Sequence, residues 1–192
     1  RPVKMVMDYQ EEFEAGNPRH PAIIKLRTGV KKDGTITAHH QDVVFNSGAY
    51  AGLMPQGYLA GTDRIAANFR IAHARFDHRH VYTNNVPGGY MRGPGEVQGS
   101  FAIESHMDEI ARKMGIDVVE FRLKNILKPG DQTPMNDTFE GVRAEETLLA
   151  AVEHAGYPQS KRPYVGVGIS MCSRPAFPKN CGAGGAFSKP RF

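Results

Sequence analysis

The sequence predicts an α+β fold in which a hairpin-rich mixed sheet is followed by helices. Two observations support this prediction: β-branched runs separated by turn residues fill the first part of the chain, and apolar residues at helical spacing fill the later part. The chain has 192 residues, of which 40% are hydrophobic and 23% charged. It can therefore bury a sizeable core, as an ordinary globular domain does.

Strands are predicted in four segments, namely residues 2–7, 22–31, 35–45 and 69–82, the last being one strand or a pair. Asp33 and Gly34 stand between the second and third segments. An Asp-Gly pair in this position predicts a β-hairpin whose two turn residues both have positive φ.

Three helices follow. The first is predicted by apolar residues at helical spacing before a glycine stop, namely Val97, Phe101, Met107, Ile110, Ala111, Met114 and then Gly115. Asp117 with Glu120 resembles a capping box and starts a second helix that reaches about residue 127. A third helix covers residues 144–155, with Leu148, Leu149 and Val152 facing inward and Gly156 as its stop. Residues 158–163 read as a linker and residues 164–171 as a strand.

Charge and composition exclude several classes of protein. The net charge is +4 and the pI about 9.1, but basic and acidic residues alternate, so we predict no nucleic-acid binding. No apolar run approaches the ~20 residues that span a bilayer, and no signal peptide opens the chain, so we expect no membrane span and a cytoplasmic location. Cys172 and Cys181 fit no zinc template; they are either two thiols or a disulfide.

Histidines and acidic residues give no convincing metal or catalytic site. His39 and His40 are neighbours on a predicted strand and so face opposite sides, and His78 and His80 share a face without a complete ligand set. We therefore predict no metal ligands and no catalytic residue in this chain. The acidic residues of the first helix are expected to form a solvated face; they are Glu104, Asp108 and Glu109.

The most informative segment is a loop rich in glycine and proline that runs into the first helix, at residues 82–109. Arg92 lies at its tightest point, before Gly93. Glycine lets a backbone approach a ligand closely, and the start of a helix offers free N–H groups and partial positive charge. The loop, the arginine and the helix start together predict a cofactor cradle. The alternative is an arginine that only pins the turn by bonding carbonyl groups.

This segment resembles the molybdopterin-binding subunit of the xanthine oxidase family of molybdenum hydroxylases, which includes xanthine dehydrogenase, aldehyde oxidase and carbon monoxide dehydrogenase. The pattern N-x-P-x-x-x-x-R-G-x-G-x-x-[QE] is matched from Asn85 to Gln98, and D-E-[IVL]-A is matched from Asp108 to Ala111. The resemblance extends to RPVKMVMDYQEEF at the start, to the hairpin KKDGTITAHHQDVVFNSGAY, and to KNIL followed by KPGD. It covers roughly the first two thirds of the chain.

The resemblance implies which residues surround the cofactor. Met91, Arg92 and Gly93 would bind the molybdenum–molybdopterin cofactor, and Pro94 would face the substrate. Xanthine-type members place an aromatic ring where this chain has Pro94, so a purine substrate is disfavoured and the carbon monoxide dehydrogenase-like or aldehyde-type branches are favoured. Gln98 would either hold the loop or support its packing.

The resemblance also implies that other parts of the site lie outside this sequence. The family's G-G-x-G-G loop, its later G-Q-G loop and its general-base glutamate are absent. We therefore expect a large-subunit fragment that is inactive alone, with residues 1–158 in the molybdopterin-binding domain and residues 159–192 a linker and the start of the following segment. Iron–sulfur clusters and FAD are expected on partner domains or subunits. The alternative is a non-catalytic structural or assembly module with the same fold.

Overall fold

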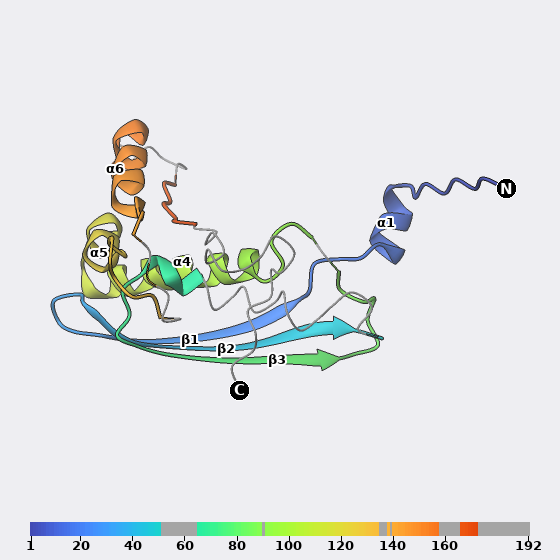
Figure 1. Cartoon of the computed structure of the whole chain (residues 1–192), viewed down its shortest axis with the longest axis horizontal. Helices are drawn as coiled ribbons and strands as arrows, with labels where there is room; N and C mark the ends of the chain where they lie inside the picture. The colour runs from blue at the N-terminus through green and yellow to red at the C-terminus, as the bar shows by residue number, and fades with distance from the viewer. Residues whose placement is uncertain (51–64, 90, 135–137, 139, 158–165, 173–192) are drawn as a thin grey trace.

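The computed structural model describes residues 1–50, 65–89, 91–134, 138, 140–157 and 166–172. In chain order they form α1 (Tyr9–Ala15), β1 (Ala22–Val30), β2 (Ile36–Gly48), the 3-10 helix η1 (Ile65–Asn68), β3 (His73–Tyr82), α4 (Glu96–Met114), α5 (Val118–Asn125) and α6 (Ala144–Ala155). Helix α4 runs along the sheet, and α5 and α6 lie near one end of it (Figure 1). The predicted α+β fold, a mixed sheet followed by helices, is confirmed.

The sheet has the order β1-β2-β3, with β1 antiparallel and β3 parallel to β2. Burial alternates along β2, whose buried side chains include His39, Gln41, Val43 and Phe45. Successive side chains of a strand point to opposite faces, so these four residues share one face. That face is the inner face of the sheet, and α4 lies over it (Figure 1).

The hairpin between β1 and β2 forms where it was predicted, but with a different turn. Gly34 has a φ of 89°, whereas Asp33 is not among the described residues with positive φ. The Gly34 N–H donates to Lys31 O, and the Lys31 N–H donates to Thr35 O. This is a turn followed by a glycine bulge, a common three-residue hairpin connection. The prediction of two positive φ values was therefore wrong.

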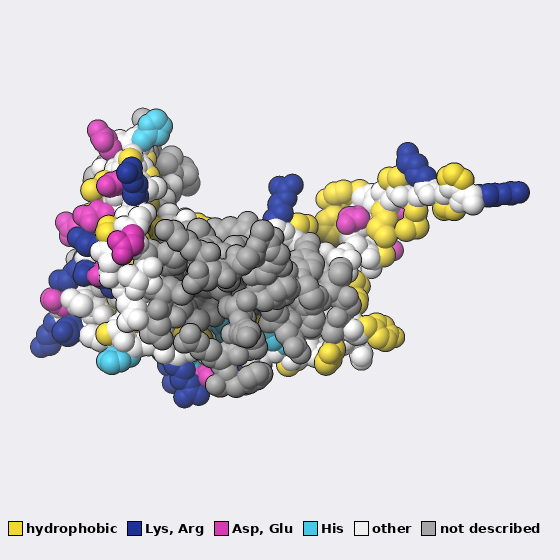
Figure 2. Space-filling view, viewed as in Figure 1, with side chains coloured by type: hydrophobic (Ala, Val, Ile, Leu, Met, Phe, Trp, Pro, Cys, Tyr) yellow, Lys and Arg dark blue, Asp and Glu magenta, His cyan; other side chains and the backbone are white. Residues whose placement is uncertain are grey.

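The N-terminal segment does not form the predicted strand at residues 2–7. Those residues pair with no strand and are exposed, and α1 follows them with Asp8 as its cap. The Asp8 carboxylate accepts from the Glu11 N–H, and the Glu11 carboxylate accepts from the Asp8 N–H, which is a capping box. Figure 2 shows apolar side chains along this projecting arm. Val3, for example, is 92% exposed.

The main core lies between α4, α5 and the sheet. Its buried members are Ile36, Ala66, Phe69, Ile71, Ile103, Met107, Ala111 and Phe121. Gly115 ends α4 in the left-handed conformation, as predicted, and the Asp117 carboxylate caps α5 by accepting from the Val119 and Glu120 N–H groups. Helix α5 ends at Asn125, slightly earlier than predicted.

The predicted inward faces of the helices are correct only in part. Leu148 is buried, but Leu149 is exposed, and Val97 and Phe101 at the start of α4 are also exposed. Residues 166–171 form no regular strand, contrary to the prediction for residues 164–171. The predicted linker at residues 158–163, residues 164 and 165, and Cys181 lie outside the described residues, while Cys172 is a free, exposed thiol.

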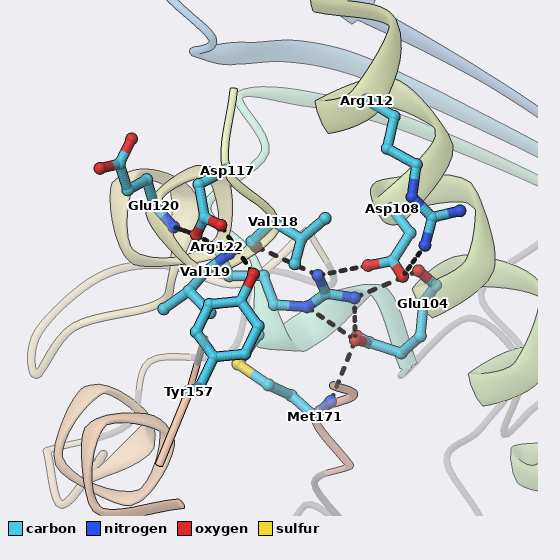
Figure 3. A network of polar contacts seen from close by, with 10 residues as sticks. All are labelled: Glu104, Asp108, Arg112, Asp117, Val118, Val119, Glu120, Arg122, Tyr157 and Met171. Carbon is cyan, nitrogen blue, oxygen red and sulfur yellow. Dashed lines mark hydrogen bonds and ion pairs between the residues drawn. The ribbon is translucent and has the colours of Figure 1, made fainter. Parts of the chain in front are cut away.

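A buried arginine joins α4 to α5 (Figure 3). Arg122 is completely buried; its Nε and Nη2 atoms donate to Glu104 Oε2 at 3.1 and 2.9 Å, and its Nη1 donates to Asp108 Oδ1 at 2.6 Å. The Met171 N–H donates to the same Glu104 oxygen at 3.0 Å, which ties residues 166–172 to the helices. The prediction that Glu104 lies on a solvated face was therefore wrong.

Burial raises the pKa of the Glu104 carboxyl, and the charge of Arg122 opposes that rise. No local pattern in the sequence indicates this pair, because its members are 18 residues apart on different helices. Glu109, by contrast, is exposed and pairs with Lys113 one turn later, as a solvated face requires.

We predict that Arg122→Met destabilises the fold by about 3–5 kcal/mol, because it leaves the buried Glu104 carboxylate without its charged partner. Equilibrium urea unfolding measures the change. The matched control is Arg112→Met, since Arg112 also contacts Asp108 but is 70% exposed, and such a surface pair contributes at most about 1 kcal/mol. Equal losses of unfolding free energy in Arg122→Met and Arg112→Met would contradict this account.

Candidate functional site

The glycine-rich loop predicted as the site connects β3 to α4 and spans residues 83–95. Its first half is bonded to the end of β2. The Ala49 N–H donates to Asn85 O at 3.0 Å, and the Gly88 N–H donates to Ser47 O at 3.3 Å. The parallel pairing of β2 and β3 thus continues into the loop and places it beside the start of α4.

Two glycines of this loop lie directly against residues 17–20, the segment between α1 and β1. A Cβ atom on Gly88 would lie 2.5 Å from the His20 ring, and one on Gly89 would lie 2.5 Å from the Asn17 side chain. Neither space would accept a larger residue. These glycines therefore serve packing within the chain rather than the approach of a ligand.

Residues 17–20, which we call the strap, also bond to the loop. The Arg19 guanidinium donates from Nη2 to Arg92 O and from Nη1 to Gly93 O, both at 3.1 Å. The Asn17 amide donates to Pro87 O at 3.3 Å. The carbonyl groups at the tight point are thus held by Arg19, a residue that no sequence motif singled out. Among the described residues, the arginine that bonds carbonyl groups of this turn is therefore Arg19.

The residues predicted to bind the cofactor and face the substrate are consecutive and accessible. Met91 and Arg92 are exposed, and Gly93 and Pro94 are half-buried. Gly93 and Gly95 have φ values of 70° and 78°, which L side chains rarely adopt. Gly95 is the N-cap of α4 and gives it no side-chain cap. The Val97 N–H donates to Gly93 O at 3.4 Å, and the other N–H groups of the first turn lie at the positive end of a 19-residue helix.

Gln98 lies on the first turn of α4 and is bonded at one end only. Its Nε2 donates to His20 O at 2.9 Å, so the side chain holds the strap rather than the loop itself. Its Oε1 is buried and has no hydrogen-bond partner among the described residues. A buried amide oxygen without a donor is unusual, and it gives the site an acceptor for an N–H or O–H group of a ligand.

Comparison with known proteins identifies the family. A family model described as "Molybdopterin cofactor-binding domain" matches residues 1–126. The chain belongs to this family. The resemblance drawn from the loop and helix motifs is therefore confirmed.

The chain is similar to several enzymes of this kind. It is 38% identical over 152 residues to a probable xanthine dehydrogenase subunit of Bacillus subtilis, with 79% of this chain and 20% of the relative covered. It is 33% identical over 178 residues to "Aldehyde oxidoreductase" of Megalodesulfovibrio gigas, with 89% and 20% covered. A solved structure of aldehyde oxidoreductase from Desulfovibrio gigas has a TM-score of 0.69 and 32% identity, with 80% of this chain and 18% of that chain covered.

The chain thus spans about a fifth of the length of these relatives. No helix among its described residues is long and apolar enough to cross a membrane. The described residues also hold no group of three or more His, Cys, Asp or Glu side chains that could bind a metal ion.

A groove of about 690 Å³ begins beside the strap in this molybdopterin-binding fold. Helix α4 and strand β1 form its walls. Lining residues that are far apart in sequence include Arg19, Ile24, Leu26, Gln98, Phe101 and His106. Phe101 is 78% exposed there. Its helical spacing with other apolar residues predicted a core position, but among the described residues it lines this groove instead.

Histidines gather on the inner face of the sheet. His39 is 3% exposed; its Nδ1 contacts Thr28 Oγ1 at 2.9 Å, and the same hydroxyl contacts His106 Nε2 at 2.9 Å. Burial, with the nearby His106, lowers the pKa of His39 to about 4. Burial also lowers the pKa values of His78, His80 and His106. On the opposite face, His40 bonds the Asp77 carboxylate at 2.8 Å, so the two neighbours do point apart.

We predict that His39 makes stability depend on pH. A histidine with a folded pKa of about 4 and an unfolded pKa of about 6.5 contributes stability above pH 6.5, and this is lost as the pH falls toward 4. Between pH 7 and pH 5 the loss is about 2 kcal/mol. Urea unfolding at the two pH values measures this. Between pH 7 and pH 5, the free energy of unfolding of His39→Gln should fall less than that of the wild type, by this amount. The control is His154→Gln, because His154 is exposed on α6. If His39→Gln loses as much unfolding free energy between the two pH values as the wild type, the assignment is contradicted.

Proposed function

We propose that this chain forms one wall of the cofactor site in an oxidoreductase that hydroxylates aldehydes, N-heterocycles or related small molecules with oxygen from water. The observation that carries the proposal is the loop of residues 91–95. It is accessible, it opens an uncapped helix, and its carbonyl groups are bonded from one side by Arg19.

The local residues fit a molybdopterin cofactor. The unpartnered Gln98 Oε1 offers an acceptor to the N–H groups of a pterin ring. The start of α4 offers N–H donors and positive potential to electron-rich atoms. The described residues hold no metal-ligand cluster, and none is required, because the dithiolene sulfurs of the cofactor hold the molybdenum.

Each residue of the loop has a distinct proposed role. Met91, Arg92 and Gly93 bind the cofactor through two kinds of group: a backbone whose positive φ at Gly93 excludes larger residues, and the exposed guanidinium of Arg92. Pro94 faces the substrate; it lacks an N–H group and cannot stack as an aromatic ring does. The bound cofactor would supply the two-electron redox chemistry of the reaction.

The wider enzyme is also part of the proposal. Relatives named as xanthine dehydrogenase, aldehyde oxidoreductase and nicotinate dehydrogenase support a small carbonyl or N-heterocyclic substrate. Pro94 favours the aldehyde-type branch within that range. Iron–sulfur clusters and FAD on partner domains or subunits would receive the electrons, and the general base would come from a part of the enzyme beyond these 192 residues. The cytoplasmic location stays a prediction.

The test is to purify the full-length protein that contains this chain and to measure molybdenum per subunit by mass spectrometry. Oxidation of aldehydes and N-heterocycles is then followed with an artificial electron acceptor. About one molybdenum atom per subunit with turnover supports the proposal. A folded protein without molybdenum would instead identify the alternative, a structural or assembly module with the same fold.

We predict that Arg92→Ala in that protein lowers activity by about 10²–10³-fold, or roughly 3–4 kcal/mol, the scale for losing one preorganised polar group at a charged transition state. The melting temperature should stay nearly unchanged, because Arg92 is exposed and its carbonyl is held by Arg19. Arg27→Ala, at an exposed position of β1, is the control. Wild-type activity at full molybdenum occupancy would remove the Arg92 side chain from the site.

A further inference from the structure

We propose that Arg19 is a positioning residue for the cofactor loop, an inference that rests on the function proposed above. Arg19 lies 73 residues before Arg92 and outside the loop motif, yet its guanidinium is bonded to the tight point of the loop. The proposal is that Arg19 orients the backbone that meets the cofactor, while contacting neither cofactor nor substrate itself.

The shape of the guanidinium matches its two acceptors. Its Nη1 and Nη2 atoms donate in parallel to two consecutive carbonyl oxygens, those of Gly93 and Arg92, both at 3.1 Å. A planar fork of this kind fixes both acceptors relative to each other, whereas a lysine ammonium acts as a single point charge. Arg19 is half-buried; its bond to Gly93 O is partly shielded from water, whereas its bond to Arg92 O is exposed.

The two bonds also set the direction of an N–H donor. In a planar trans peptide the C=O of Arg92 and the N–H of Gly93 point in opposite directions. With the carbonyl held toward Arg19, the Gly93 N–H is directed away from Arg19. The positive charge on the carbonyl side polarises the same peptide and strengthens that N–H as a donor. Gly93 allows this arrangement because its φ is 70°.

The strap is anchored well enough to transmit this constraint. The Asn46 N–H donates to Pro21 O at 2.9 Å, which joins the residue directly after the strap to β2. The Gly89 N–H donates to Pro18 O at 3.0 Å, and Gln98 donates to His20 O at 2.9 Å. The strap therefore bridges the sheet, the loop and the first turn of α4, and Arg19 is its contact at the residues proposed to meet the cofactor.

The experiment compares Arg19→Lys and Arg19→Ala with the wild type in the full-length protein. Arg27→Lys and Arg27→Ala are the matched controls, since Arg27 is an exposed arginine of β1. Four quantities are measured: molybdenum per subunit, kcat and KM, the melting temperature, and amide hydrogen exchange of peptides covering residues 91–99. Arg19→Lys keeps the charge but not the fork, so it remains informative if Arg19→Ala fails to fold.

We expect both Arg19 variants to lower kcat by about 10–100-fold, with KM nearly unchanged. This is the scale for residues that orient the groups around a metal without contacting it. Retained molybdenum should fall several-fold, exchange at residues 91–99 should rise, and Arg19→Lys should be intermediate. Arg27 variants should match the wild type.

Two results would overturn the assignment while leaving the proposed function intact. One is wild-type kcat, molybdenum content and exchange in both Arg19 variants. The other is a lower melting temperature with normal kcat per molybdenum, which is the sign of a merely structural residue. A wild-type protein that contains no molybdenum would instead overturn the proposed function, and the Arg19 assignment with it.

Discussion

The position of α4 depends on the bonds that the buried Arg122 guanidinium makes to it. It is fully buried between α4 and α5 and bonds two carboxylates of α4 as well as the carbonyl of Glu104. A charge in that place is tolerated only because every side of it meets an acceptor. Any shift of α4 would break several of these bonds together, so the helix has one well-defined position over the sheet. The position of the loop is set in turn, because the loop leads directly into α4.

The two ends of α4 are held by different means. The middle and end of the helix are fixed by the ion network and by apolar packing of Ile103, Met107 and Ala111. The start has no side-chain cap, and the loop before it contains two glycines with positive φ, residues that lose much conformational freedom on ordering. The strap offsets this cost with hydrogen bonds from outside the loop.

Local signals explain which features could be predicted from the sequence. The strands predicted at residues 22–31 and 35–45, the stop at Gly115 and the cap at Asp117 follow from residues close together in the chain. These elements were confirmed, with the strands at Ala22–Val30 and Ile36–Gly48. Features that need partners distant in sequence were missed: the Glu104–Arg122 pair, the contacts of Arg19 with the loop and the groove lined by Phe101. The prediction of a strand at residues 2–7 was wrong for the same reason. A strand needs a neighbouring strand to pair with, and the apolar composition of a segment does not show whether one is present. For the site, sequence patterns located the loop, and the roles of Met91, Arg92, Gly93 and Pro94 stay predictions.

The separation between the residues that stabilise the fold and those proposed to meet the cofactor has a consequence for specificity. Met91 and Arg92 are exposed and Pro94 is only half-buried, so none of them belongs to the core cluster or to the ion network. Exposed positions of this kind tolerate substitution with little change in stability. Arg19 holds the carbonyl groups of Arg92 and Gly93, which every residue carries, so these two bonds do not require a particular side chain at position 94. If Pro94 faces the substrate, as proposed above, replacing it by an aromatic residue is expected to change the substrate while the strap keeps its bonds to the loop.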